Sequence, residues 1–352
     1  MTARRDGRDL GAPLKAHRID EAVLAKYLND HIAGFGDTCT IQQFRGGQSN
    51  PTFLLQADSG SYVLRKKPPG ELLPSAHAVD REFRVISALA SSEVPVPKAL
   101  HLCEDDSIIG QMFYVMDYVA GRVFSDPSLP GCTPAERTTA YRSSAAVLGE
   151  LHAVDYQVVG LETFGRPDNY VARQVARWSR QYASSKTEDC AAMDQLMEWL
   201  PANDPDDNRT AIVHGDYRPG NLIFDNDDLI VVAVLDWELS TIGHPLADLG
   251  YFLLPYRLDA KILGSGLRGL DLEEFGIPNE QAMIDAYIAS AGSEQVNNVD
   301  YYIVFSMFRL AAILAGVLRR GIDGNASDPS AIERGRAFSQ FADSAWAIAR
   351  QL

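Results

Sequence analysis

The sequence is poor in cysteine and has no surplus of basic residues. Its four cysteines are irregularly spaced and none forms a CxxC pair, which disfavours a disulfide framework or a zinc site and predicts thiols in a reducing cytosol. Lys and Arg number 32 against 47 Asp and Glu, giving a net charge of −15. This charge balance argues against a nucleic-acid partner, and it provides no electrostatic attraction between the protein and an anionic membrane. An acidic surface could favour a cationic substrate, although solubility alone accounts for it. We therefore expect a cytoplasmic protein.

Long hydrophobic runs are also scarce. The longest, Tyr301–Leu318, is interrupted by Ser306 and Arg309, so it predicts a buried helix rather than a membrane span. Arg309 could meet an anionic acceptor, although a core ion pair is the favoured interpretation. The segment Met1–Arg18 lacks the apolar core of a signal peptide, and we expect a mobile lead-in there. With 352 residues, 46% hydrophobic and 22% charged, the chain can form a sizeable core and two lobes. Its oligomeric state stays unknown at this stage.

Hydrophobic periodicity divides the chain into a strand-rich and a helix-rich part. The first part has strand patterns at Thr40–Phe44, Thr52–Gln56, Ser61–Lys66 and Met112–Tyr118, and helix patterns at Ile19–Ile32 and Ala78–Ala90. The second has helix patterns at Pro134–Val154, Tyr170–Ser184, Cys190–Leu200, Pro278–Ser290, Val299–Arg320 and Ser330–Gln351, with short strands at Ala211–Val213, Leu222–Phe224 and Ile230–Leu235. This order predicts an α+β fold with a small lobe over 1–118 and a larger helical lobe over 119–352.

The stretch His214–Asn221 contains candidate groups for phosphoryl transfer. Asp216 follows a short apolar strand and can accept a hydrogen bond from a substrate hydroxyl. Asn221, five residues on, can offer a neutral oxygen to Mg²⁺, and Pro219-Gly220 provides a turn that lets both side chains face one point. A solvated loop would contain the same residue types, so this spacing alone leaves both interpretations open.

Asp236 supplies the missing carboxylate. It ends the apolar strand Leu229–Leu235, where a carboxylate needs a cation or hydrogen-bond donors. A divalent metal would satisfy it, as would a capping role on the turn Ser240–Gly243. Taken together, Asp216, Asn221 and Asp236 predict a phosphotransferase site in which Asp216 is catalytic and the other two residues hold Mg²⁺.

The motifs HGDYRPGN and LDWELSTIGHPLADLG resemble the aminoglycoside phosphotransferase family of the protein-kinase-like superfamily. The segments GGQSNPTF, YVLRKKPPG, REFRVISAL and VPVPK are similar to the branch related to domains fused to some acyl-CoA dehydrogenases. The resemblance covers most of the chain. It implies a two-lobed kinase-like fold, with a small, mostly antiparallel β lobe and a helical lobe that holds the catalytic loop and the acceptor pocket. ATP and Mg²⁺ would bind between the lobes.

The resemblance also implies residue roles in nucleotide binding. It assigns them to Gly46, Gly47, Ser49, Asn50, Val63, Arg65, Glu82, Met116 and Tyr118. Glycines in the first group would let backbone N–H groups approach phosphates, although a plain hairpin turn explains them equally. The family usually has lysine where Arg65 stands, so whether Arg65 or Lys66 holds the phosphates stays open. Glu82 would pair with that cation, and His214 and Asp248 would brace the catalytic loop.

The functional prediction is a small-molecule kinase that transfers the γ-phosphoryl group of ATP to a hydroxyl. The branch resemblance indicates a hydroxyacyl acceptor, such as a CoA thioester, while aminoglycosides, choline-like molecules and sugars stay open, as does GTP in place of ATP. A catalytically silent nucleotide-binding scaffold is the alternative that the arginine substitution favours. A protein kinase is disfavoured because no activation segment separates Glu238 from Asp248.

Overall fold

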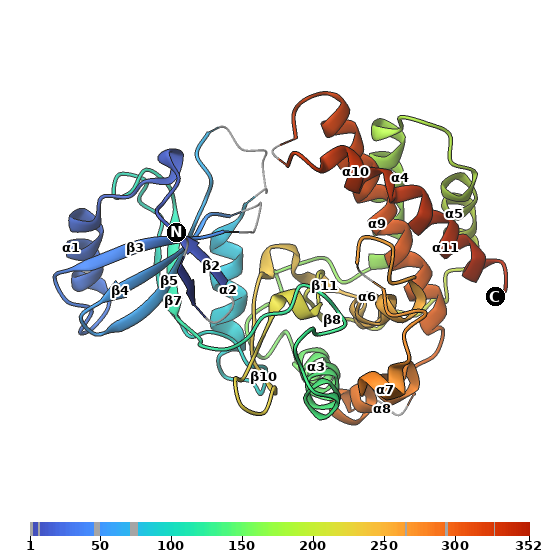
Figure 1. Ribbon diagram of the computed structural model, residues 1–352, viewed down its shortest axis with the longest axis horizontal. Helices are drawn as coiled ribbons and strands as arrows, with labels where there is room; N and C mark the ends of the chain where they lie inside the picture. Colours follow the sequence, from blue (N-terminus) through green and yellow to red (C-terminus); the bar gives the residue numbers. More distant parts are fainter. Residues whose placement is uncertain are drawn as a thin grey trace. The chain divides into compact units, whose positions relative to one another are not determined.

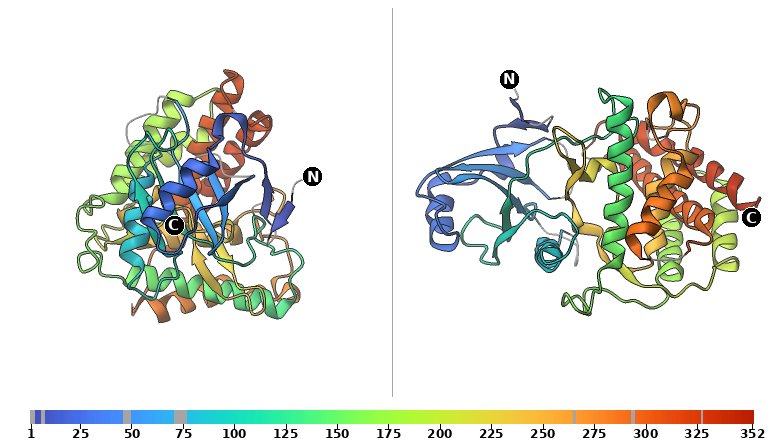
Figure 2. Two further views of the ribbon diagram at one scale, coloured as in Figure 1. Left: turned by 90° about the vertical axis from the view of Figure 1, so that its left-hand side faces the viewer. Right: turned by 90° about the horizontal axis from the view of Figure 1, so that it is seen from below.

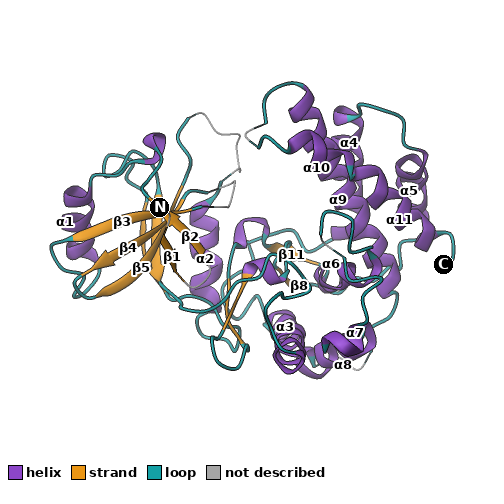
Figure 3. Cartoon of the chain, in the orientation of Figure 1, coloured by secondary structure: helices purple, strands orange, loops and turns teal. Residues whose placement is uncertain are grey.

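The computed structural model describes residues 3–5, 8–45, 50–70, 77–264, 266–292, 295–326 and 328–352. The chain divides into two compact units. Unit 1 comprises Met1–Val123, Val159–Leu161 and Asn221–Ser240, and unit 2 comprises Phe124–Val158, Glu162–Gly220 and Thr241–Leu352. Most strands belong to unit 1 and most helices to unit 2 (Figure 3). The predicted α+β class, with an antiparallel sheet followed by a helical part, is confirmed.

Unit 1 is built on a seven-stranded antiparallel sheet. In spatial order its strands are β1 (Ala3–Arg5), β2 (Arg8–Gly11), β3 (Cys39–Phe44), β4 (Thr52–Ala57), β5 (Gly60–Lys66), β7 (Phe113–Asp117) and β6 (Ala99–Cys103). The expectation of a mobile lead-in was wrong, because β1 and β2 extend one edge of the sheet (Figure 2). Leu10 pairs with Phe44 and is only 1% exposed, and hydrogen bonds from Arg45 to the carbonyls of Asp9 and Ala12 also hold the segment.

Two helices cover opposite faces of this sheet (Figure 1). Helix α1 (Glu21–His31) begins at Asp20, whose side chain accepts from the N–H groups of the first turn, and buries Leu24 and Leu28. These leucines join Phe53 and Leu64 in one hydrophobic core. Helix α2 (Val79–Leu89) buries Glu82 along with its apolar stripe. The buried charge of Glu82 therefore lies on the face of the sheet that α2 covers, and it needs partners there.

Unit 1 also contains the short helix η1 (Lys15–His17) and a hairpin. Strands β9 (Leu222–Phe224) and β10 (Val231–Val234) are antiparallel, with Leu222 opposite Val234. The short helix η3 (Trp237–Leu239) follows β10. In this register Asn221, the residue before β9, lies next to the end of β10. The two predicted metal-binding residues, Asn221 and Asp236, are therefore at the same end of the hairpin.

Unit 2 is mainly helical. Its strands are β8 (Ala211–Val213) and β11 (Thr241–Gly243), and its helices are α3 (Pro134–Ala153), α4 (Tyr170–Ser185), α5 (Ala191–Ala202), α6 (Pro245–Arg257), α7 (Leu272–Phe275), α8 (Glu280–Ala291), α9 (Val299–Ile322), α10 (Ala331–Arg336) and α11 (Phe338–Ala349). The central helix α9 packs against α4, α5, α6, α10 and α11. It is long and apolar enough to cross a membrane, but 83% of its apolar window is buried within the protein, as a core helix requires.

Two helical segments differ from the sequence expectation. The helix expected over Ser330–Gln351 breaks at Ala337 into α10 and α11. Helix α6 was not predicted, since Gly250 and Pro255 weaken its helical signal. Its packing explains the glycine, because a Cβ at Gly250 would lie 2.5 Å from the carbonyl carbon of Tyr302 on α9. Tertiary contact has therefore overridden local propensity.

Gly250→Ala and Gly316→Ala form a matched test of this packing. A Cβ at Gly250 meets α9 backbone, whereas a Cβ at Gly316 has no neighbour nearer than 3.5 Å. We expect Gly250→Ala to lower the free energy of unfolding by about 1–3 kcal/mol through overpacking. Gly316→Ala should raise it by up to about 1 kcal/mol, because alanine favours a helix interior. Urea denaturation measures both, and a Gly250→Ala protein as stable as wild type would contradict the packing described.

Candidate functional site

Arg65 is a buried cation near the end of β5, on the face that α2 covers. Arg65 is only 8% exposed. Its Nε lies 3.3 Å from Oε2 of Glu82, and its Nη2 donates to Oδ1 of Asp236 at 3.0 Å. One guanidinium therefore joins the sheet, helix α2 and the residue that follows β10. Burial opposes its charge, but Glu82 and Asp236 outweigh that effect and raise the pKa of Arg65 above its ordinary value.

Lys66 points to the opposite face of β5, because side chains alternate along a strand. It is 3% exposed, and its Nζ lies 5.9 Å from the centre of the Phe53 ring. Burial lowers the pKa of Lys66, since no described carboxylate pairs with it. Of the two neighbouring cations, Arg65 is thus the one in contact with Glu82 and Asp236.

Glu82 is fully buried and has several donors. Its Oε1 accepts from Nδ2 of Asn50 at 2.6 Å, and its Oε2 accepts from the hydroxyl of Tyr114 at 3.1 Å. Burial raises the pKa of Glu82, while Arg65 and the two hydrogen bonds oppose that rise. The predicted pairing of Glu82 with the strand cation is therefore present, and Asn50 supports it instead of lying on the surface.

Asp236 occupies a left-handed backbone conformation, with φ 65° and ψ 61°. Such a conformation is costly for a residue other than glycine and is typical of functional sites. The side chain is 35% exposed, and none of the described residues hydrogen-bonds to its second oxygen, Oδ2. Asp236 thus combines backbone strain with an accessible carboxylate oxygen.

Asn221 lies beside Asp236 at one end of the β9–β10 hairpin, because the N–H of Leu235 donates to the Asn221 carbonyl at 2.8 Å. Amide and carboxylate oxygens suit Mg²⁺. Two carboxylates, Asp236 and Glu82, also contact the single positive charge of Arg65. The charge of this cluster would therefore be balanced by a further cation. No group of three His, Cys, Asp or Glu side chains that could hold a metal occurs in the part of the chain that the structure describes.

The remaining predicted nucleotide residues fall into two groups. Gly46, Gly47 and Ser49 lie outside the described residues. Val63 on β5 and Met116 on β7 are buried partners in the sheet register, and the N–H of Tyr118 donates to the Ser61 carbonyl at 3.4 Å. The structure therefore places Val63 and Met116 side by side on the strands that also carry Arg65 and Tyr114.

Asp216 belongs to unit 2, where it follows β8. Its side chain is 24% exposed. Oδ1 accepts from the hydroxyl of Tyr251 at 2.6 Å, and Oδ2 accepts from Nε of Arg218 at 3.3 Å. The sequence analysis did not identify Tyr251 or Arg218, although Arg218 stands inside the recognised motif and Tyr251 lies three residues after Asp248 on α6.

The backbone before Asp216 is held from two helices. Asp248 on α6 accepts from the N–H groups of His214 at 2.5 Å and Gly215 at 2.9 Å. Arg309 on α9 donates to the carbonyl of Gly215, which has a φ of 85°. Burial opposes ionisation of Asp248, but the nearby His152 outweighs it and lowers the pKa of Asp248. The structure thus gives Asp248 the bracing position that the motif implied.

Arg309 corrects one expectation. No carboxylate among the described residues forms an ion pair with it. Its guanidinium carbon lies 5.9 Å from the Trp178 ring centre and 5.7 Å from that of Tyr251. Cation–π contacts and the Gly215 carbonyl replace the expected ion pair, because these groups satisfy a guanidinium without a second buried charge.

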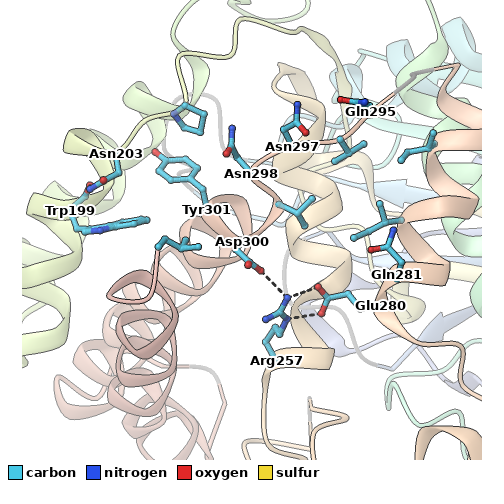
Figure 4. Close-up of a pocket in the computed structure, with 16 residues that line it drawn as sticks. Trp199, Asn203, Arg257, Glu280, Gln281, Gln295, Asn297, Asn298, Asp300 and Tyr301 are labelled. Atoms are coloured by element: carbon cyan, nitrogen blue, oxygen red, sulfur yellow. Dashed lines mark hydrogen bonds and ion pairs between the residues drawn. The ribbon is translucent and has the colours of Figure 1, made fainter.

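A separate cavity of about 690 Å³ lies in unit 2 between α5, α8 and the start of α9 (Figure 4). Asp216 and Arg309 are not among the residues that line it. The cation in its wall, Arg257, is held by both oxygens of Glu280 at 2.6 Å and by Asp300 at 2.8 Å. Since two carboxylates already neutralise Arg257, this cavity is poorly suited to an anionic acceptor.

The fold is that of the protein-kinase-like phosphotransferases. Residues 40–280 match the sequence profile of the Phosphotransferase enzyme family, and the chain belongs to this family. It is 43% identical to a Ralstonia eutropha protein described as a candidate aminoglycoside phosphotransferase, with a TM-score of 0.87 over 95% of this chain and 99% of that one. A spectinomycin phosphotransferase crystallised with ADP and spectinomycin shares the fold, with a TM-score of 0.61 and 13% identity over 94% of this chain and 98% of that one.

Longer curated proteins are also similar. Human acyl-CoA dehydrogenase family member 11 is 45% identical over 325 residues, which cover 91% of this chain and 42% of that protein. Mouse acyl-CoA dehydrogenase family member 10 is 44% identical over 338 residues, covering 95% of this chain and 32% of that protein. The chain thus spans less than half the length of these relatives. The resemblance drawn from the motifs is confirmed.

Arg65→Met and Lys66→Met test the different surroundings of the two cations. Removing Arg65 leaves Glu82 and Asp236 without their shared cation, so we expect a loss of about 3–5 kcal/mol in the free energy of unfolding. Lys66→Met should change stability by less than about 1 kcal/mol, because a methionine fills the same space without a buried amine. Equal losses in urea denaturation would contradict the assignment of Arg65 to the ion network.

Proposed function

We propose that this chain transfers the γ-phosphoryl group of ATP, bound with Mg²⁺, to a hydroxyl group of a small molecule. The observation that carries the proposal is the contact of Arg65 with both Glu82 and Asp236, with Asn221 beside Asp236. A fixed cation adjacent to hard oxygen ligands is what a bound polyphosphate and its metal require. The scaffold alternative rested on arginine replacing lysine, and Arg65 retains the contact with Glu82.

Each nucleotide-side residue has a role in this proposal. Arg65 binds phosphate oxygens, and Glu82 holds its guanidinium in place. Asn221 and Asp236 provide oxygen ligands for Mg²⁺, which neutralises phosphate charge when bound. The other predicted nucleotide contacts are Gly46, Gly47, Ser49 and Asn50 near the phosphates and Val63, Met116 and Tyr118 near the base.

Asp216 orients the acceptor. Tyr251 and Arg218 both donate to its carboxylate, and these two contacts hold the side chain in one orientation. It accepts a hydrogen bond from the hydroxyl as the acceptor oxygen forms its bond to phosphorus and the bond to the ADP oxygen breaks. The hydroxyl proton passes to Asp216 late in this step, as a loose transition state allows.

The acceptor is proposed to be a hydroxyacyl group carried as a CoA thioester or a related metabolite. Arg218 supports an anionic molecule, since its 45% exposed side chain places positive charge beside Asp216. The names of the longer relatives point to acyl-CoA chemistry. A polycationic aminoglycoside, to which the name of the Ralstonia protein points, would meet repulsion from Arg218.

Asp216→Asn and Asp236→Asn should separate the acceptor side from the metal side. We expect Asp216→Asn to lose at least about 100-fold in turnover while its affinity for Mg-ATP stays within about twofold of wild type. Asp236→Asn should lose turnover and also the Mg²⁺-dependent part of ATP affinity. Calorimetric titration with ATP, in Mg²⁺ or in EDTA, measures this difference. Full turnover by Asp216→Asn would refute its catalytic role.

The acceptor class is tested by ADP release with hydroxyacyl-CoA thioesters, their non-hydroxylated acyl-CoA counterparts, and aminoglycosides. We expect release only with the hydroxylated thioesters, because the non-hydroxylated thioester lacks the nucleophile. Asp216→Asn serves as the control for background hydrolysis. Stimulation by aminoglycosides alone would reject the proposed acceptor but keep the phosphotransferase mechanism.

A further inference from the structure

Tyr251 contacts the proposed catalytic carboxylate from the interior of unit 2. It lies on α6, one turn after Asp248, and its hydroxyl donates to Oδ1 of Asp216 at 2.6 Å. Burial and the neighbouring Asp216 raise the pKa of Tyr251 above its ordinary value, so the phenol remains protonated and able to donate. The hydrogen bond to a carboxylate is of the stronger, charge-assisted kind.

The same helix also fixes the backbone next to Asp216. Asp248 binds the N–H groups of His214 and Gly215, while Arg309 binds the carbonyl of Gly215 and lies 5.7 Å from the centre of the Tyr251 ring. Helix α6 therefore holds both the loop backbone and the Asp216 carboxylate in place. Moving one without the other requires breaking the Tyr251 contact.

The two oxygens of Asp216 have different environments. Oδ1 accepts from Tyr251, whose side chain extends from a packed helix, whereas Oδ2 accepts from Arg218 at 3.3 Å. The Arg218 side chain is 45% exposed, so its contact is the more exchangeable. His214 lies behind the loop and accepts from the N–H of Asp216 through Nδ1. Oδ1 is therefore held from the packed interior of unit 2, whereas Oδ2 contacts a side chain that is exposed to solvent.

We propose that Tyr251 is a positioning residue that holds Oδ1 of Asp216 so that Oδ2 faces the acceptor hydroxyl. This inference rests on the proposed function of Asp216. Holding one oxygen fixes the rotation of the carboxylate, which orients the acceptor for in-line attack and restricts proton transfer to Oδ2.

Tyr251→Phe removes the donor and keeps the ring against Arg309. The probe reaction is hydrolysis of Mg-ATP with water as the acceptor, followed by ADP release. We expect kcat to fall by roughly 10- to 100-fold, as for a displaced catalytic group, with the KM for Mg-ATP unchanged.

Tyr256→Phe is the matched control. Tyr256 lies five residues further on α6, and its hydroxyl donates to the Pro278 carbonyl at 2.8 Å, far along the helix from the loop contacts. The Tyr256→Phe variant also loses a tyrosine hydrogen bond of similar length, but it should keep the kcat of wild type and the pH profile of kcat. A fall in kcat of similar size in both variants would assign the effect to α6 stability and overturn the proposal.

A second measurement does not depend on turnover. Carbon-13 NMR of aspartate-labelled protein, with Asp216→Asn for assignment, follows the carboxyl resonance of Asp216 at one fixed pH. This resonance should move in Tyr251→Phe, which lacks the hydrogen bond to Oδ1, and stay in place in Tyr256→Phe. An unmoved resonance in Tyr251→Phe overturns the inference and leaves the proposed function intact, whereas normal turnover by Asp216→Asn refutes the proposed function itself.

Discussion

The burial of one positive charge at Arg65 is the constraint from which the organisation of unit 1 follows. A guanidinium removed from water must be paired. Glu82 and Asp236 pair it from a helix and from the end of a hairpin, 17 and 171 residues away in sequence. Asn50 and Tyr114 then complete the hydrogen bonds of Glu82. A charged cluster of this kind contributes less to stability than to fixing the positions of its members.

The corresponding constraint in unit 2 is the backbone of the loop after β8. Gly215 is bonded through its N–H to α6 and through its carbonyl to α9. Those helices pack closely where Gly250 meets Tyr302. Precision at Asp216 thus depends on helix packing that is remote from the reaction, and the Tyr251 hydroxyl extends that control to the carboxylate itself.

Much of the fold could be predicted from the sequence, because strand alternation and helical periodicity are local signals. The helix at Val299–Ile322 and the strand at Gly60–Lys66 are examples. The strands before Gly11 could not, since Leu10 is the only large apolar side chain in them. At the site, Asp216, Asn221 and Asp236 taken together indicated the phosphotransferase residues. Tyr251 was missed because its contact with Asp216 depends on the path of α6. The partner of Arg309 was missed because backbone carbonyls leave no sequence signal.

The most direct test of the account is a crystal structure of the protein with Mg²⁺ and a non-hydrolysable ATP analogue. The account predicts Mg²⁺ bound to the side-chain oxygens of Asn221 and Asp236, and phosphate oxygens in contact with the Arg65 guanidinium. A nucleotide whose phosphates and metal contact none of these three side chains would contradict it.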